Sequence, residues 1–281
     1  MIWIKDFNRS LDHNLLMPTS DNATRYWVEA ARLPQLDPDQ IASQNYMLPP
    51  AIHKDVRGQQ VEFVGQLLRQ QSHPRDVLDL GCGPGTWALQ LSALADSWLG
   101  YDIAPAFVET ARREADQRGL NHLKFEIGSM LEVDQGQHFN LVLMGGILGY
   151  VNDVDLLPLM RRAASHLGPD GVIYVRVSVI PGLYPRLTLK RGYPIHYRKT
   201  RQYLQIFEEA GFQVEAERDY AFTAASLSTV YTALARWFGR TGMTAYRVAL
   251  RLRPLSFGLA RRLLDLTPLP QSMQFILRRK G

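Results

Sequence analysis

Three glycines at alternate positions directly follow a short apolar strand, and this arrangement constrains the fold more than any other feature of the chain. Residues 77–88 read V-L-D-L-G-C-G-P-G-T-W-A, with glycines at Gly81, Gly83 and Gly85 and a helix predicted from Thr86. Glycine has no Cβ, so it adopts positive φ angles and lets a ligand approach the backbone. The spacing G-x-G-x-G differs from the G-x-G-x-x-G of dinucleotide sites. The segment therefore predicts a strand, a ligand-binding loop and a helix, and it does not favour a nicotinamide cofactor.

The residues around this loop extend the pattern. Acidic Asp79 stands two positions before the first glycine, and Cys82 lies inside the turn. The whole run resembles motif I of the class I S-adenosylmethionine-dependent methyltransferases. The resemblance implies that S-adenosyl-L-methionine is the cofactor and that residues of this segment bind it, namely Asp79, Gly81, Cys82, Gly83 and Gly85. Cys82 is expected to be a small turn residue and not a nucleophile, because no histidine is near it in the sequence.

A second acidic residue stands where the next strand ends. Residues 97–101 are predicted as a strand, and Asp102 and Ile103 follow it. An acidic side chain at the tip of the second strand of a βαβ unit can accept hydrogen bonds from both ribose hydroxyls of a cofactor. Asp102 is therefore the predicted ribose ligand, with Ile103 beside the cofactor, and a solvated loop aspartate is the alternative.

Two further strand ends complete the predicted cofactor site. Residues 123–127 alternate as a third strand and lead into Ser129 and Met130. Many members of the family carry aspartate in place of this serine, where it accepts a hydrogen bond from the adenine amino group. Here the contact is expected to be weaker, or to come from the Ser129 hydroxyl, from backbone groups and from Met130. Residues 139–144 read as a buried parallel strand that ends at Gly145, where the family closes over the methionine part of the cofactor.

The other predicted elements surround that core. Apolar spacing, capping residues and stop signals predict helices over residues 21–33, from 37, and over 56–71, 155–167 and 200–210. Strands are predicted over residues 171–179, 212–217 and 274–278, and the resemblance implies that the last one is antiparallel. Alternating strands and helices favour an α/β fold with a doubly wound, seven-stranded Rossmann-like sheet. N-terminal helices and a helical insertion before the last strand are expected in addition.

These elements divide the chain into four predicted parts. They are an N-terminal helical cap over residues 1–55, a cofactor-binding core over 56–220, a basic helical insertion or lid over 221–270, and the final strand over 271–281. Residues 221–281 hold ten Lys or Arg and one acid, a balance of +9, whereas the whole chain carries +5. Three interpretations of the insertion stay open: a cap packed on the sheet edge, a lid that borders the acceptor pocket, or a basic amphipathic helix on an anionic membrane surface.

Composition and cysteine usage indicate an intracellular globular protein. The chain has 281 residues, of which 46% are hydrophobic, enough for a sizeable core. Its N-terminal residues M-I-W-I-K-D-F lack the apolar core of a signal peptide. A single cysteine allows no disulfide within the chain. A reducing cytoplasm, where the cofactor is made, is therefore the expected location.

The methyl transfer that the resemblance implies requires few chemical groups from the protein. The methyl group leaves a sulfonium by in-line displacement, so the site has to hold the nucleophile in line and exclude water. An alcohol or phenol acceptor benefits from a base, for which histidine is the usual residue. Relatives often carry a histidine in place of Gly149, so a base cannot simply be carried over.

Three other residues are candidates near the pocket mouth. His53 precedes the helix predicted at 56–71, in a segment that folds over the cofactor in this family, and His196 lies in a loop predicted at 180–198. For both histidines, structural hydrogen bonding is the alternative to proton transfer. Tyr150 is expected to line the pocket more than to transfer a proton. The loop at 180–198 also carries several basic residues, which would attract an acidic acceptor or simply be solvated.

Several classes of methyltransferase are disfavoured by the segment after residue 144. It reads G-G-I-L-G-Y and so lacks the N/D-P-P-Y motif of nucleic-acid amino methyltransferases, the two glutamates of protein arginine methyltransferases and the aspartate of metal-dependent catechol-type enzymes. No Cys or His cluster has metal-ligand spacing. The remaining prediction is a metal-independent enzyme that methylates an O, N or C atom of a small-molecule acceptor. A lipid acceptor at the membrane surface and a non-catalytic cofactor-binding module are the alternatives, and nucleic acid is not favoured as a partner.

Overall fold

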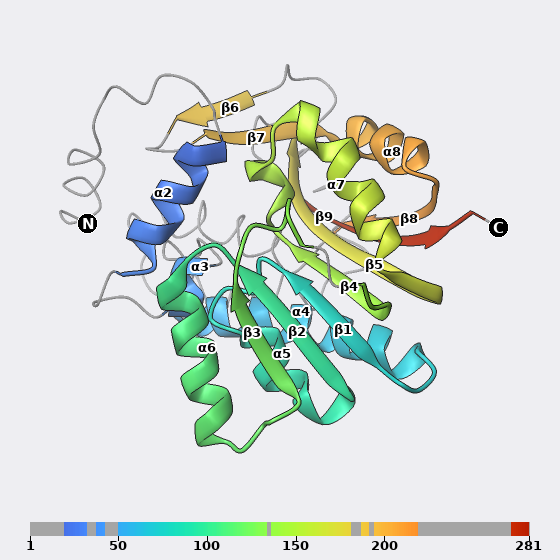
Figure 1. Ribbon diagram of the computed structural model, residues 1–281. Coiled ribbons are helices and arrows are strands. Elements are labelled where there is room, and N and C mark those ends of the chain that lie inside the picture. Colours follow the sequence, from blue (N-terminus) through green and yellow to red (C-terminus); the bar gives the residue numbers. More distant parts are fainter. Residues whose placement is uncertain are drawn as a thin grey trace, which may run out of the picture.

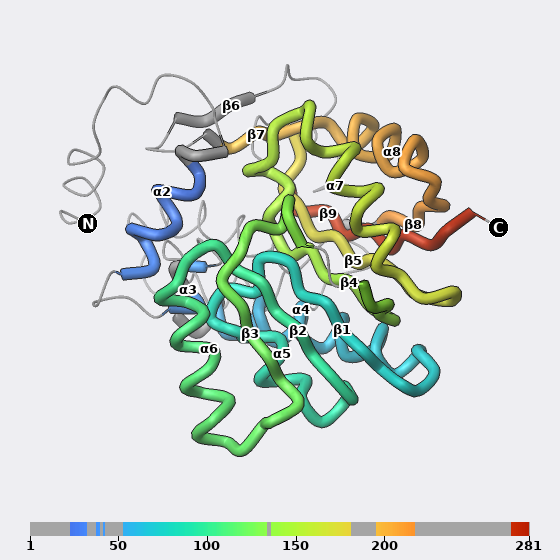
Figure 2. The backbone as a smooth tube through the Cα atoms, in the orientation of Figure 1, coloured from blue at the N-terminus to red at the C-terminus, as the bar shows by residue number. Residues whose placement is uncertain are grey.

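The computed structural model describes residues 20–32, 38–42, 50–133, 136–180, 187–190, 194–218 and 271–280 (Figure 2). The basic insertion predicted at 221–270 lies outside these ranges, as do residues 1–19 of the predicted N-terminal cap. The three interpretations of the insertion therefore stay predictions.

A single sheet forms the centre of the molecule, and it contains all seven predicted strands. They are β1 (Asp76–Leu80), β2 (Ser97–Asp102), β3 (Leu123–Ile127), β4 (Phe139–Gly145), β5 (Leu167–Ile180), β8 (Phe212–Arg218) and β9 (Gln271–Arg279). Their order is β3-β2-β1-β4-β5-β9-β8. Strands β1 to β5 run parallel, and β9 runs antiparallel to both of its neighbours. The predicted fold class, including the antiparallel last strand, is confirmed.

Helices cover both faces of the sheet, as a doubly wound fold requires (Figure 1). One face packs on α4 (Pro50–Gln70), α5 (Thr86–Leu91) and α6 (Pro105–Gln117), and the other on α7 (Asp153–Ser165) and α8 (Thr200–Glu209). Successive residues of each strand point to opposite faces. In β1, Val77 therefore joins the core under α4, and Leu78 joins the core under α7 and α8. Each face of the sheet is buried by its own layer of helices. Burial of this apolar surface is the main contribution to the stability of the sheet.

Two short strands stand where the sequence predicted a loop. β6 (Leu187–Lys190) and β7 (Pro194–Lys199) form an antiparallel hairpin. β7 also pairs in parallel with the last two residues of β5, Val179 and Ile180, so the sheet has nine strands among the described residues. The prediction of a loop over 180–198 was wrong here because the segment is rich in Lys, Arg and Tyr and lacks a clear apolar alternation. Pairing to β5 and burial of one arginine, described below, decide its structure instead.

The N-terminal helices lie over the carboxyl ends of the parallel strands. α2 (Ser20–Ala30) packs Tyr26 and Ala30 against Ala104 and Phe107 at the start of α6 (Figure 1). α3 (Pro38–Ala42) approaches the glycine loop. α4 begins at Pro50, six residues before the predicted start, because proline is well suited to the first position of a helix. Among the described residues, no helix has both the length and the apolar character needed to cross a membrane.

Candidate functional site

The glycine loop adopts a backbone that other residues would not tolerate. Gly81, Gly83 and Gly85 have φ angles of 75°, 56° and 75°. A Cβ on Gly81 would also clash with the side chain of Ile147, from the loop after β4. The amide groups of Gly81 and Cys82 both donate to the carbonyl of Tyr101 at the end of β2, at 2.8 and 2.9 Å. The loop therefore crosses the ends of β1 and β2, and Gly81 and Gly83 lie in the wall of the pocket described below.

The third glycine and the cysteine of this loop have structural roles. A Cβ on Gly85 would lie 2.9 Å from Ala111 and 3.1 Å from Phe125, so this glycine lets α5 and α6 approach each other. Burial raises the pKa of the Cys82 thiol well above its usual value, and the nearby carboxylates raise it further. A neutral, buried thiol is a poor nucleophile. Cys82 is thus a turn residue beside the site, as expected.

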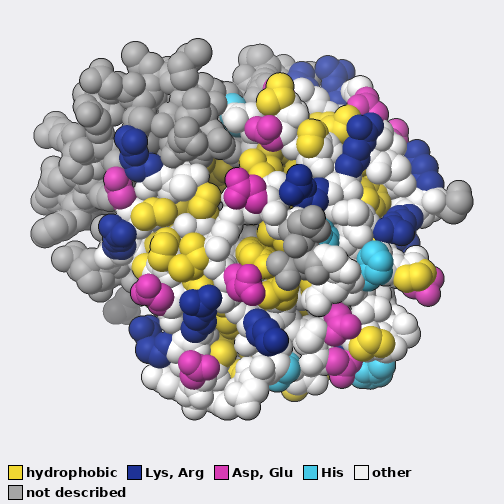
Figure 3. Space-filling model, viewed as in Figure 1, with side chains coloured by type: hydrophobic (Ala, Val, Ile, Leu, Met, Phe, Trp, Pro, Cys, Tyr) yellow, Lys and Arg dark blue, Asp and Glu magenta, His cyan; other side chains and the backbone are white. Residues whose placement is uncertain are grey.

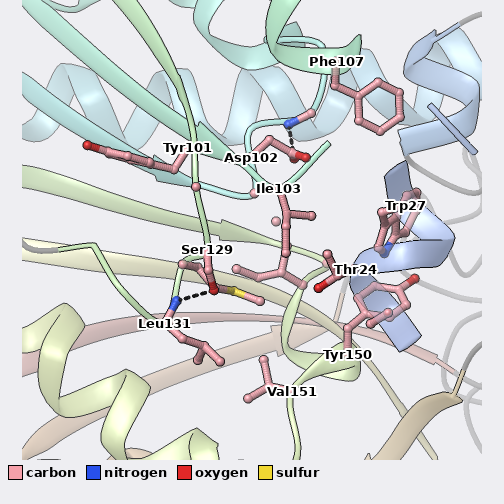
Figure 4. A pocket seen from close by; sticks show the side chains of 18 of the residues that line it. Thr24, Trp27, Tyr101, Asp102, Ile103, Phe107, Ser129, Leu131, Tyr150 and Val151 are labelled. Carbon is pink, nitrogen blue, oxygen red and sulfur yellow. Dashed lines mark hydrogen bonds between the residues drawn. The ribbon is translucent and has the colours of Figure 1, made fainter. Parts of the chain in front are cut away.

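A large pocket opens beside the glycine loop, at the carboxyl ends of β1 to β4. It has a volume of about 900 Å³, counting the space at its mouth. Its walls are mainly apolar, and hydrophobic side chains gather near the middle of this face of the molecule (Figure 3). The predicted residues that line it are Gly81, Gly83, Asp102, Ile103, Ser129, Met130, Gly145 and Tyr150. Figure 4 shows Ser129 on one side of the pocket, Ile103 near its middle with Asp102 above it, and Tyr150 on the other side with Thr24 and Trp27 from α2.

Asp102 lies in the wall of this pocket, next to the glycine loop. Its carboxylate accepts a hydrogen bond from the amide of Gly83 at 2.8 Å and another from the amide of Ala104 at 2.9 Å. Burial raises the pKa of Asp102, and the hydrogen bonds from the backbone act in the opposite direction. A carboxylate has about four lone-pair sites on its two oxygens, more than these backbone bonds use. The side chain can therefore accept hydroxyl groups of a ligand while it braces the glycine loop against the start of α6.

Ser129 forms the polar part of the far end. Its hydroxyl oxygen accepts a hydrogen bond from the amide of Leu131 at 3.2 Å (Figure 4). One lone pair and the hydroxyl hydrogen remain for a ligand. A carboxylate in this position would offer more acceptors and a negative charge, so a serine would bind an amino group of a ligand less strongly.

A second, smaller pocket with polar walls adjoins the large one. It has a volume of about 390 Å³, counting its mouth, and shares Gly81, Gly83 and Gly145 with the large pocket. Asp79, Cys82, Trp87, Arg57 and Arg176 complete its walls. A Cβ on Gly145 would clash with the indole of Trp87, so glycine is required where the two pockets meet. A ligand that lies across the glycine loop would thus have an apolar environment at one end and a charged one at the other.

Asp79 is a buried carboxyl group with an altered protonation equilibrium. Its side chain is 3% exposed. Burial, helped by the nearby Asp102 carboxylate, raises the pKa of Asp79 to about 7, although the Trp98 side chain and the Arg57 guanidinium lower it. The group therefore changes charge near neutral pH, and a bound cation would favour its ionised form.

A hydrogen-bond network holds Arg57 in the wall of the polar pocket. The guanidinium donates to both oxygens of Asp39 in α3, at 2.7 and 3.0 Å, and stacks over Trp87 at 5.7 Å. Asp39 also accepts from the hydroxyl of Thr86 at 2.6 Å. Burial alone would raise the pKa of Asp39, but Arg57 and the Thr86 hydroxyl lower it below its usual value. α3 is therefore tied to α4 and α5, and it covers the glycine loop.

Of the predicted base candidates, Tyr150 lies in the pocket and the two histidines do not. His53 lies in the first turn of α4, not ahead of the helix as predicted, with its Nε2 atom 3.5 Å from Asp39. His196 is buried on β7. Neither histidine lines either of the two pockets in the part of the chain that the structure describes. Tyr150 lies against Trp27, with 5.4 Å between ring centroids. Proton transfer by any of the three stays a prediction.

Sequence reasoning missed both arginines of the polar pocket. Arg176 is the one charge in the buried run V-I-Y-V-R-V-S-V of β5 and is 8% exposed. A charged residue within a buried strand is unfavourable unless it is paired or has a function, and this signal could have found it. Arg57 lies among polar residues of α4 and has no such signal. Among the described residues, no group of three or more His, Cys, Asp or Glu is arranged to hold a metal ion.

The comparisons with known proteins agree with this geometry. A family model described as a methyltransferase domain matches residues 77–171, which run from β1 into β5 and include the glycine loop, Asp102 and Ser129. Residues 77–171 thus match a methyltransferase domain, although the match covers less than half of the chain. The resemblance of the glycine loop and the predicted fold are thereby confirmed.

Two curated relatives resemble part of the chain. The chain is 32% identical over 100 residues to a ubiquinone biosynthesis O-methyltransferase of Azorhizobium caulinodans, covering 35% of this chain and 38% of the relative. It is 31% identical over 137 residues to the probable methyltransferase ltbC of Aspergillus luteorubrus, covering 44% of this chain and 47% of the relative. The matches thus span less than half of the length of either relative.

Solved structures share the fold over most of the chain. Geranyl diphosphate C-methyltransferase from Streptomyces coelicolor, with S-adenosyl-L-homocysteine bound, superposes with a TM-score of 0.64 at 15% identity over 94% of this chain and 99% of that one. An O-methyltransferase of a Brevibacillus brevis polyketide synthase, also with S-adenosyl-L-homocysteine bound, gives 0.60 at 15% identity over 88% and 81%. At these identities, the likeness shows a shared fold.

Proposed function

We propose that the protein is an S-adenosyl-L-methionine-dependent methyltransferase that acts on a small molecule without a metal. The observation that carries the proposal is the pair of joined pockets across the glycine loop. The apolar pocket, with Asp102 in its wall, has the walls that an adenosine requires, and the polar pocket, with Arg57, Arg176 and Asp79, has the charges that a zwitterionic amino acid requires. Structures of the same fold with S-adenosyl-L-homocysteine bound support the choice of cofactor.

The proposed roles follow from the chemistry of each side chain. Asp102 accepts hydrogen bonds from the ribose hydroxyls, and Ile103, Ser129 and Met130 surround the base. Asp79 accepts from the ammonium group, and Arg176 donates to the carboxylate. The cofactor, when bound, supplies a methyl group on a sulfonium. The protein then has to orient the acceptor and keep water out, which the apolar walls around Tyr150 and Trp27 favour.

The acceptor is proposed as a small organic molecule, methylated at an O, N or C atom. The two curated relatives are named as an O-methyltransferase and as a probable methyltransferase, which makes an oxygen acceptor the first choice to test. A cytoplasmic location, and a role for residues 221–270 as a lid or as a surface for anionic lipid, belong to the proposal as well. Nucleic acid is not proposed as a partner.

Transfer from labelled cofactor tests the proposal directly. Purified protein is incubated with S-adenosyl-L-methionine labelled in the methyl group and with a metabolite extract or a panel of phenols, amines and lipids. Label is expected in a small-molecule fraction. Binding of S-adenosylhomocysteine without transfer of label to any fraction would favour the non-catalytic cofactor-binding module. Label in a lipid fraction alone would favour a lipid acceptor at the membrane surface.

Replacing Arg176 with glutamine is expected to weaken binding of the amino acid end of the cofactor and to leave binding of its adenosine end almost unchanged. The variant should bind S-adenosylhomocysteine about 30-fold more weakly, because a charge-assisted hydrogen bond contributes about 1.5–3 kcal/mol. Methylthioadenosine, which lacks the amino acid end, should bind within about twofold of wild type by calorimetry. An equal loss for both ligands would contradict the role of Arg176 and indicate a disturbed sheet.

A further inference from the structure

We infer that Arg198 is a positioning residue: it fixes the loop after β4 and thereby holds Tyr150 in the wall of the large pocket. The inference rests on the proposed function of that pocket. Arg198 lies on β7, the strand that the sequence did not predict, and the loop that it contacts comprises residues 148–152 between β4 and α7.

The guanidinium of Arg198 contacts both ends of this loop. One terminal nitrogen donates to the carbonyl of Leu148 at 3.0 Å, and the other donates to the carbonyl of Val151 at 2.6 Å. The Nε atom donates to the Asp153 carboxylate at 2.7 Å, at the start of α7. Tyr150 lies between the two carbonyls in sequence, in the 3-10 turn η2 (Leu148–Tyr150). The loop is therefore held on either side of the residue that faces the pocket.

Burial makes these contacts hard to replace. The Arg198 side chain is 1% exposed, and its guanidinium stacks over the ring of Tyr203 at 5.8 Å. A buried charge is stable only when its donors are satisfied, so the arginine favours the one loop conformation that offers both carbonyls. Lysine keeps the charge but has no planar fork of five N–H donors, so it cannot reach the three acceptors at once.

The same strand supports the loop by packing. A Cβ on Gly149 would lie 3.2 Å from the side chain of Ile195 on β7 and 4.0 Å from the carbonyl of His196. A Cβ at position 149 would thus require the Ile195 side chain to shift by a few tenths of an ångström. The absence of a side chain at Gly149 lets the hairpin pack directly beneath the turn that carries Tyr150.

The loop forms one wall of the large pocket. Tyr150, Val151 and Asn152 of the loop all line it, and Tyr150 meets Trp27 of α2 edge to face at 5.4 Å between ring centroids (Figure 4). A change in the loop would therefore move the Tyr150 ring away from the ligand and from α2. Arg198 itself does not line the pocket in the described part of the chain, so its effect on binding would pass through the loop.

A double-mutant cycle on S-adenosylhomocysteine binding tests this inference. Arg198→Lys is expected to weaken binding about tenfold, and Tyr150→Ala to weaken it by a similar factor. Because the arginine acts through the tyrosine, the double variant should also lose about tenfold and not the 100-fold that independent effects would give. Arg162→Lys, an exposed arginine on α7, is the matched control and should bind as wild type does.

Amide hydrogen exchange gives a readout that does not depend on a ligand. In unliganded Arg198→Lys, residues 148–152 should exchange at least about tenfold faster, while β1 and β4 keep their protection. Asp153→Asn is the milder second variant, should Arg198→Lys fail to fold. It leaves the two carbonyl contacts in place, and its affinity for S-adenosylhomocysteine should be about threefold lower than that of wild type. In the Tyr150→Ala background, Asp153→Asn should cause no further loss of affinity.

The outcomes separate the inference from the proposed function. Wild-type protein that does not bind S-adenosylhomocysteine would contradict the proposed function, and hydrogen exchange would still test the role of Arg198 in the loop. Additive losses in the cycle, unchanged exchange in residues 148–152, or full affinity in Arg198→Lys would each overturn the inference.

Discussion

Asp102→Asn is expected to bind S-adenosylhomocysteine about 100-fold more weakly than wild type. The carboxylate would accept from the ribose hydroxyls, and each charge-assisted hydrogen bond contributes about 1.5–3 kcal/mol. The amide in the variant has one acceptor oxygen, which the amides of Gly83 and Ala104 would compete for. Methylthioadenosine should lose affinity by the same factor, because it keeps the ribose. Titration calorimetry with both ligands measures the effect.

A 2′-deoxy analogue of the ligand provides the control for Asp102. If the carboxylate binds that hydroxyl, removing the hydroxyl should weaken binding to wild type and leave binding to Asp102→Asn almost unchanged. The melting temperature of the variant shows whether the brace between the glycine loop and α6 has been lost as well. Undiminished affinity in a folded variant would refute the ribose role, and with it the assignment of the large pocket.

The second large effect is expected from pH and from Asp79→Asn. The pKa of Asp79 is raised from 3.8 to about 7. The carboxylate form would accept from the ligand's ammonium, so affinity for S-adenosylhomocysteine should rise about tenfold from pH 6 to pH 8 as the ionised fraction rises about tenfold. Asp79→Asn should bind about 30-fold more weakly than wild type at pH 8 and show little pH dependence. Calorimetry in buffers of matched ionic strength measures both.

Ionisation of Asp79, which is expected to favour ligand binding, is expected to lower the stability of the fold. Between pH 4 and pH 7 the folded state holds a proton on Asp79 that the unfolded state has released. Stability contributed by this group is therefore present at low pH and is lost as the pH rises through about 7. Asp79→Asn should gain about 2 kcal/mol in free energy of unfolding relative to wild type at pH 5 and about 4 kcal/mol at pH 8, since one pKa unit corresponds to about 1.4 kcal/mol.

Urea unfolding at the two pH values measures this difference. A variant that is more stable yet binds less tightly at pH 8 would show that the Asp79 carboxylate increases ligand affinity and lowers the stability of the fold. Equal gains at both pH values would show that folding does not raise the pKa of Asp79, and the predicted pH dependence of binding would then be wrong.

Much of the fold could be predicted because its signals are local. Apolar runs such as residues 139–144 and stop signals such as Gly211 fix the type of each element, and Gly81 and Gly83 fix a turn that needs positive φ. Boundaries were less accurate: α7 begins at Asp153, two residues before the predicted start, and β5 begins at Leu167 instead of Gly171. The start of β5 depends on pairing between strands, with Leu167 opposite Phe139, and no short window of sequence contains that pairing.

The sequence by itself determined the glycine loop, the carboxylate after β2 and the alternation of strands and helices, because each depends on the conformational limits or the polarity of neighbouring residues. Only the tertiary structure decided which side chains from distant segments of the chain contact one another. Arg176 faces the glycine loop because β5 pairs with β4 in a register that sets it opposite Gly145. Arg198 became a buried anchor because β7 adds to the end of β5. Side chains far apart in sequence converge through strand register and burial, and those are properties of the whole packed sheet.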